Sequence, residues 1–129
     1  NSDGSATCLI PGTYKITYSL QLVNSATASE HTAYVWLKVD GSLVERSTTA
    51  STIPKASSTN SYVCAYSEVV FNINENEKIW LYWATDLAAT SGGTKGVYIY
   101  ADAAQTSPYI RPAIPSAIGS ITFVSALST

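Results

Sequence analysis

The strongest constraint on this fold is a two-residue alternation of apolar and polar side chains that runs through almost the whole chain. It is clearest over residues 12–24, where every second residue is apolar: Tyr14, Ile16, Tyr18, Leu20 and Leu22. Successive side chains of a strand point to opposite faces, so this pattern predicts a long strand with one face on a core. No apolar stripe with helical spacing competes with it, and we expect an all-β protein.

The same alternation predicts further strands, separated by turn residues and by polar stretches. We place them at residues 6–10, 33–39, 42–49, 62–73, 78–84, 96–101 and 116–126. Asp40-Gly41 is the strongest hairpin signal, because both residue types tolerate positive φ. The stretches 24–32, 56–61, 86–96 and the proline-rich 102–115 read as loops. Strands at this spacing predict a β-sandwich. We expect a single domain over 1–129, either a whole protein or the C-terminal part of a longer chain.

The charge content limits the partners that the surface can have. Only 12% of residues are charged, whereas 46% are hydrophobic, and the formal net charge is −2. The seven basic residues are scattered, so nucleic acid is not an expected partner. No apolar run approaches the roughly 18 residues that a membrane helix needs, so membrane insertion is not expected. A surface so poor in charge indicates that part of it is covered by a protein partner.

Two predicted strands are apolar on both faces. In 62–73 and 78–84, aromatic or aliphatic residues occupy both parities. A two-layer sandwich covers only one face of each strand, so the second face indicates a neighbouring subunit. Our candidates for that interface are Trp36, Tyr66, Trp80 and Tyr82.

Catalytic residue types are sparse. His31 is the only histidine and stands in a polar loop beside Glu30. It could be the base of a Ser–His–Asp triad, but no nucleophile motif accompanies the many serines, so a solvated loop histidine is the favoured interpretation. The acids are dispersed, which gives no metal site and no catalytic carboxylate pair. We expect no enzyme, no catalytic residue and no cofactor.

Cys8 and Cys64 fit neither a CxxC nor a zinc spacing. Two buried thiols are favoured over a disulfide between the first strand and a central strand, and the sequence leaves both possibilities open.

The aromatic residues offer the remaining candidates for a binding site. Most alternate within strands, which favours packing in the core or between subunits over a sugar-stacking platform. Tyr109 in the proline-rich loop, and Tyr98 or Tyr100, are better placed to face a ligand. With His31 and Arg111 they form our ligand-facing set, and recognition would lie in His31, 57–61 and 105–111.

Four motifs in order resemble a structural domain of tailed-phage virions. They are residues 12–22 (GTYKITYSLQL), 35–41 (VWLKVDG), 69–73 (VVFNI) with 79–83 (IWLYW), and 112–122 (PAIPSAIGSIT). This domain occurs at tail-fibre tips and in capsid decoration or head-fibre proteins, and its fold is similar to the jelly roll of the complement and tumour-necrosis-factor superfamily. The resemblance covers most of the chain.

The resemblance implies a jelly-roll sandwich, homotrimers and a place on the virion surface, with other virion proteins as partners. It implies no catalytic residue and no cofactor. The competing interpretation is a receptor- or glycan-binding module that attaches a tail fibre to the host surface.

Overall fold

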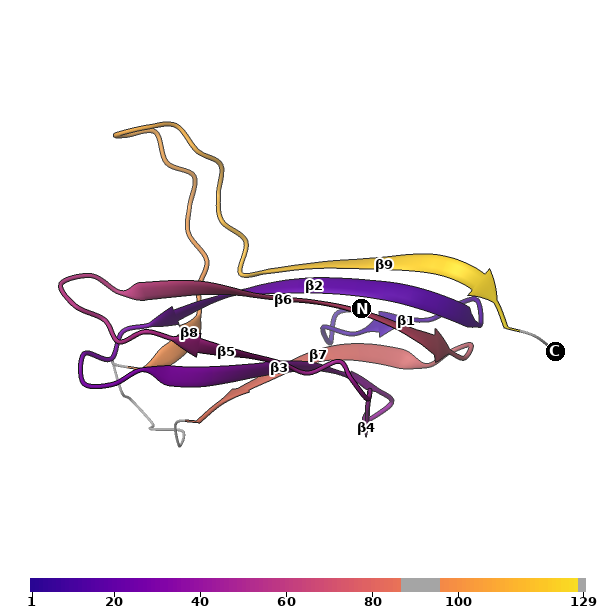
Figure 1. Cartoon of the computed structure of the whole chain (residues 1–129). Helices are drawn as coiled ribbons and strands as arrows, with labels where there is room; N and C mark the ends of the chain where they lie inside the picture. The colour runs from indigo at the N-terminus through magenta and orange to yellow at the C-terminus, as the bar shows by residue number, and fades with distance from the viewer. Residues whose placement is uncertain (87–95, 128–129) are drawn as a thin grey trace.

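The computed structural model describes residues 1–86 and 96–127. Within them the chain is all-β, with two antiparallel sheets and no helix, as the alternation predicted. The sheets lie face to face in an elongated sandwich (Figure 1). The strands are β1 (Ala6–Thr7), β2 (Gly12–Asn24), β3 (His31–Val39), β4 (Ser42–Leu43), β5 (Thr49–Ile53), β6 (Ser61–Ile73), β7 (Lys78–Thr85), β8 (Val97–Ile99) and β9 (Ala117–Ala126).

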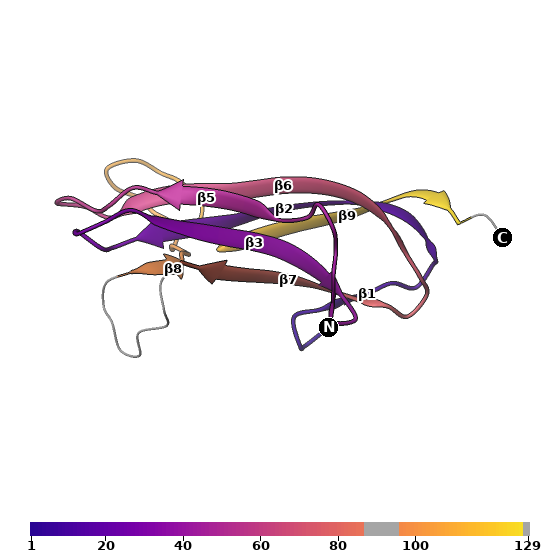
Figure 2. The same ribbon diagram turned by 60° about the horizontal axis from the view of Figure 1, so that its bottom comes forward.

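One sheet is built around β3 and the other around β2. In the β3 sheet the order is β1-β7-β3-β4, and β5 also pairs with β3. In the β2 sheet the order is β6-β2-β8, and β9 also pairs with β2. β2 and β6 are paired over their whole lengths, from Gly12 opposite Ile73 to Asn24 opposite Ser61. Figure 2 shows the β3 sheet in front of the β2 sheet.

The core lies between the sheets and is filled by the inward parity of each long strand. From β2 it takes Ile16, Tyr18, Leu20 and Leu22, and from β3 it takes Ala33, Val35 and Leu37, all of them buried. A fully buried valine, leucine or isoleucine side chain contributes about 1.5–3 kcal/mol relative to an exposed one. The alternation therefore identified the core face of the central strands correctly.

Tyr18 also joins the two sheets through its hydroxyl group. The ring is buried, and its oxygen lies 3.1 Å from the carbonyl oxygen of Val35 in the other sheet. It also lies within hydrogen-bond distance of the Ser47 carbonyl oxygen. Burial raises the pKa of this phenol above its ordinary value. The hydroxyl therefore remains a protonated donor at neutral pH.

The hairpin after β3 forms where it was predicted, but the return strand is different. Asp40 and Gly41 have φ values of 46° and 85°, as the turn signal required. The single strand predicted at 42–49 is wrong: β4 ends at Leu43, and a separate strand, β5, pairs with β3 further along. Ser47 causes the break, because its buried hydroxyl donates to the Val44 carbonyl and accepts from the Leu37 amide.

The other predicted strands are found with small shifts at their ends, and β3, β6 and β7 extend one or two residues beyond the predicted bounds. The leading strand is limited to Ala6–Thr7, and the strand predicted at 96–101 is β8, Val97–Ile99. The loop predicted at 86–96 lies outside the described residues except at its two ends.

Candidate functional site

β9 is exposed along its whole length. Each of its ten residues is exposed, and none carries a charge. It pairs with β2 on one side, and no pairing of its other edge is found among the described residues. An uncharged edge strand of this length is a template for association with another chain, and proteins normally cover or blunt it.

Exposed apolar side chains also lie on the outer face of the β2 sheet, where they flank β2, whose own outward residues over 13–21 are polar or charged. Tyr66 on β6 and Ile118 on β9 both lie opposite Ser19 of β2, so their side chains share this face. They are 60% and 57% exposed. Tyr62 and Val70 lie on the same parity of β6 and are exposed as well. We call Tyr62, Tyr66, Val70 and Ile118 the outer patch.

The predicted interface residues do not form one surface. Tyr66 belongs to the outer patch, but Trp36, Trp80 and Tyr82 lie on the outer face of the β3 sheet, on the opposite side of the sandwich. Trp36 stacks on Tyr82 with ring centroids 6.1 Å apart, and the Lys38 ammonium lies 4.3 Å from the Tyr82 ring centroid. These aromatic side chains partly cover one another, although Nε1 of Trp36 is buried without a hydrogen-bond partner.

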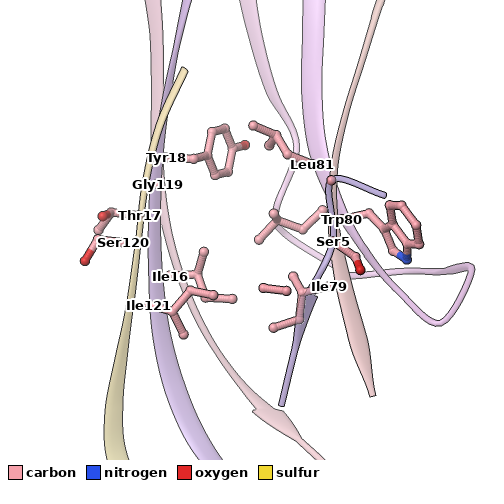
Figure 3. A pocket seen from close by; sticks show the side chains of 13 residues that line it. Ser5, Ile16, Thr17, Tyr18, Ile79, Trp80, Leu81, Gly119, Ser120 and Ile121 are labelled. Atoms are coloured by element: carbon pink, nitrogen blue, oxygen red, sulfur yellow. The ribbon is translucent and has the colours of Figure 1, made fainter. Parts of the chain in front are cut away.

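A pocket opens between the two sheets at the edge formed by β9, β1 and β7. We call it the edge pocket; its volume is about 270 Å³. Figure 3 shows Ile16 and Tyr18 from β2 facing Ile79 and Leu81 from β7, while Thr17 and Ser120 point away. No charged residue lines it. Leu81 stays 37% exposed and Ile121 46% exposed, although both lie on core-facing parities. The sandwich is therefore not closed at this edge.

The proline-rich segment 101–116 is an ordered arm. Its stem carries paired backbone hydrogen bonds between Asp102 and Ile114 and between Gln105 and Arg111, at 2.9–3.1 Å. The Arg111 guanidinium also pairs with the Asp102 carboxylate and donates to the Ala103 carbonyl at 3.2 Å. The irregular loop predicted here is thus a braced hairpin without a regular strand, and it projects away from the sandwich (Figure 1).

The base of the arm meets a group of tyrosines at one end of the β2 sheet. Tyr62 and Tyr100 are edge-on, with ring centroids 5.0 Å apart. Asn60 Nδ2 donates to the Tyr98 hydroxyl at 3.4 Å. Hydrogen bonds from the Tyr100 hydroxyl and the Arg111 guanidinium hold the pKa of Asp102 below its ordinary value.

The predicted ligand-facing residues are therefore divided between two places. Arg111 is mostly engaged in bracing the arm. Tyr109 is 60% exposed at the arm tip, and Tyr98 is exposed near the arm base. His31 lies in the other sheet and is not the solvated loop histidine that was expected: it is the first residue of β3, its side chain is only 13% exposed, and it hydrogen-bonds with Ser29 and Asp86.

His31 lies between a serine and an acid. Its Nε2 is 3.2 Å from Ser29 Oγ, and its Nδ1 is 3.2 Å from Asp86 Oδ1. This is the connectivity of a Ser–His–Asp triad. However, Ser29 and Asp86 are exposed, and the other Asp86 oxygen accepts the Thr32 amide hydrogen at 3.1 Å. The arrangement thus ties the end of β7 to the start of β3.

The two cysteines are unpaired and differ from each other. Cys8 is buried, as expected, but Cys64 is exposed, so the expectation of two buried thiols is wrong for Cys64. Cys64 is exposed because its side chain lies on the same outward face of β6 as that of Tyr66. Among residues 1–86 and 96–127 there is no group of three or more His, Cys, Asp or Glu side chains able to hold a metal ion.

The chain matches no known protein-family model and no curated protein. No helix within the described part of the chain is long and apolar enough to cross a membrane.

Proposed function

We propose that this protein is a non-enzymatic structural component of the virion surface, a homotrimeric knob that decorates a phage capsid or tips a fibre. The observation that supports it most is β9, ten uncharged and exposed residues at a sheet edge. Burying such a strand against a neighbour removes an aggregation hazard and gains apolar contact area. The resemblance to the tailed-phage domain supplies the trimeric order and the location on the virion.

The size of the outer face of the β2 sheet supports the same proposal. Three paired strands of 10 to 13 residues cover the outer face of the β2 sheet. At about 3.3 Å per residue and about 4.8 Å between strands, they span roughly 600 Å². A stable interface buries about 800 Å² per partner, so this face accounts for most of one.

The charge on this face favours a second copy over a highly charged partner. Lys15 and Glu68 are the only charged side chains on the outward parities of β2, β6 and β9. With one charge of each sign, the face gives a highly charged partner little to bind, whereas an identical chain presents the same nearly neutral surface.

The proposed fold is a jelly roll of the complement and tumour-necrosis-factor type. The chain passes repeatedly between the sheets, from β2 to β3, from β5 to β6 and from β6 to β7, as a jelly roll requires. The competing proposal is a receptor- or glycan-binding module. Its support is the tyrosine group at the arm base, where exposed Tyr98 and Tyr62 lie beside Asn60.

Location and binding distinguish the two proposals. Immunogold labelling of virions that contain this chain is expected to decorate the capsid or fibre surface, and purified protein is expected to rebind particles that lack it. Saturable binding to host cells without particle binding would support the receptor module. No label on virions and no binding to particles would contradict the structural role.

A variant pair tests the surface itself. Ile118→Lys places a charge on exposed β9 and is expected to lower the assembled fraction at low micromolar concentration. Tyr34→Lys, on an exposed outward position of the β3 sheet, is the matched control and should leave assembly unchanged. Equal assembly of both variants would show that the outer face of the β2 sheet is not the interface.

A further inference from the structure

The arm is an insertion into a single edge strand. Both β8 and β9 pair antiparallel with the same edge of β2, β8 with residues 22–24 and β9 with residues 12–20. Gln21 lies between these stretches, and it bonds to both ends of the arm: its carbonyl accepts the Tyr100 amide hydrogen at 2.9 Å, and its amide donates to the Ser116 carbonyl at 2.8 Å. Residues 101–116 thus leave the sheet and return to it at one point.

The tip of the arm is apolar and uncovered. Ile110 is 86% exposed and the neighbouring Tyr109 is also largely exposed. The stem is held by its four backbone hydrogen bonds and the Arg111–Asp102 pair, so the tip is presented on a preorganised support. An aromatic and an aliphatic side chain held away from the sandwich add nothing to the stability of the monomer. They are, however, the kinds of side chain that anchor a binding contact.

The edge pocket matches the tip of the arm in its lack of charge and in its size. It is lined mainly by apolar side chains and carries no charge, and residues 106–110 of the tip are also uncharged. Its volume of about 270 Å³ compares with the roughly 150 Å³ of an apolar cavity that accepts one benzene molecule. One ring and one branched aliphatic side chain can therefore be accommodated.

The tip and the pocket of one chain face different directions. The arm rises from the outer side of the β2 sheet, whereas the pocket opens between the sheets (Figures 1 and 3). We propose that the arm tip, Tyr109 and Ile110, docks into the edge pocket of a second copy, beside its β9. This inference rests on the proposed self-association and specifies its contact. Since tip and pocket are different surfaces, the contact is head-to-tail and can close into a ring.

Two cysteine variants test the contact directly. Ile110→Cys labels the tip, and Gly119→Cys labels the pocket at a position where an added Cβ meets nothing within 4 Å. Both are made in a Cys64→Ser background, because Cys64 is exposed and unpaired. Mixing the two single variants under oxidising conditions is expected to give covalent dimers that reducing agent dissolves. Ala104→Cys, on the exposed stem, replaces the tip variant as the control and should give none.

Ile110→Asp tests the energetics without relying on a cross-link. It is expected to raise the concentration needed for assembly at least about tenfold, which corresponds to about 1.4 kcal/mol. Ala104→Asp adds the same charge to the stem and should have no such effect. Deleting 101–116 joins Tyr100 to Ala117 in register with Gln21 and Leu20, so the sandwich should fold while assembly weakens.

The outcomes separate this inference from the proposed function. If the native chain assembles, but Ile110→Asp assembles equally well and the mixed cysteine variants do not cross-link, the arm contact is wrong and self-association stands. If Ile110→Asp assembles normally but loses binding to host cells, the tip faces a receptor and the inference is overturned. A native chain that stays monomeric would contradict both proposals.

Discussion

Gly12 and Phe123 lie in such close contact that a Cβ atom on Gly12 would come within 2.6 Å of Phe123 Cε2 and 2.7 Å of the Ser125 carbonyl oxygen. Phe123 also packs edge-on against Tyr14, with ring centroids 5.4 Å apart. Gly12 starts β2 and pairs with Ala126 at the end of β9. The missing side chain therefore allows β9 to lie along β2.

Replacing Gly12 by alanine is accordingly expected to destabilise the fold. Because the carbonyl oxygen belongs to the backbone, it cannot move aside cheaply, and overpacking of this kind costs about 1–3 kcal/mol. Urea unfolding of Gly12→Ala and Gly119→Ala measures the difference. Gly119 has open space around its Cβ position and serves as the control. Equal midpoints for the two variants would show that β9 adapts to the extra methyl group.

The central strands could be predicted from the sequence because their alternation is set by burial. β2, β3, β6 and β7 were each placed to within about two residues at either end. β5 was missed because Thr49–Ile53 is mostly polar, and because the Asp40-Gly41 turn signalled an immediate return strand. β4 and β5 pair with the same edge of β3, and the local pattern does not show that the chain leaves this edge around Ser47 before it pairs again.

The surfaces could be predicted only in part. Parity showed that Tyr66 and Trp80 point outward from their own strands, but not that these strands belong to opposite sheets. The arm was read as an irregular loop, since its brace joins Asp102 to Arg111, nine positions apart, without any periodic signal. β9 was expected to close the fold, yet its place at an open edge leaves both its faces exposed.

Tyr18→Phe is expected to lower stability without changing the fold. The ring still fills the same space, but the Val35 and Ser47 carbonyl groups lose the hydroxyl that lies within hydrogen-bond distance of both. A lost buried hydrogen bond costs about 0.5–1.5 kcal/mol, and an acceptor left unsatisfied adds to this. Thermal and urea unfolding of the native chain and of Tyr18→Phe measure the difference in the free energy of unfolding. No change, or a gain in stability, would mean that the hydroxyl is not a link between the sheets.

The stability that the Asp102 carboxylate gives to the arm is expected to depend on pH. The pKa of Asp102 is lowered, first by the Tyr100 hydroxyl and then by Arg111. A lowered carboxyl pKa gives stability that is present above its ordinary value of about 3.9 and is lost as the pH falls through the lowered value. Tyr100→Phe removes the largest cause and should raise the pKa of Asp102. Tyr98→Phe is the control and should leave the pKa of Asp102 unchanged.

The carboxyl carbon shift of Asp102, followed by NMR across acidic pH, reads this pKa directly. The same titration curve for the native chain and for Tyr100→Phe would contradict the role given to the Tyr100 hydroxyl.

Ser29, His31 and Asp86 are expected to act structurally and not as a triad. Asp86→Ala removes the acceptor of both His31 and the Thr32 amide, and because the Asp86 side chain is 43% exposed we expect a cost below about 1 kcal/mol. Ser29→Ala should cost less, because it leaves the His31–Asp86 pair intact. Covalent labelling of Ser29 by a fluorophosphonate probe, lost in Asp86→Ala, would instead establish a hydrolase site.

The most direct test of the central claim is the mass of the native chain in solution, measured by light scattering after size exclusion at low micromolar concentration. The proposed homotrimer, associated through uncovered β9 and the outer face of the β2 sheet, predicts a mass of three chains of 13.7 kDa each. A single species with the mass of one chain would contradict the account, because β9 and the outer patch would then be stable in water without a partner.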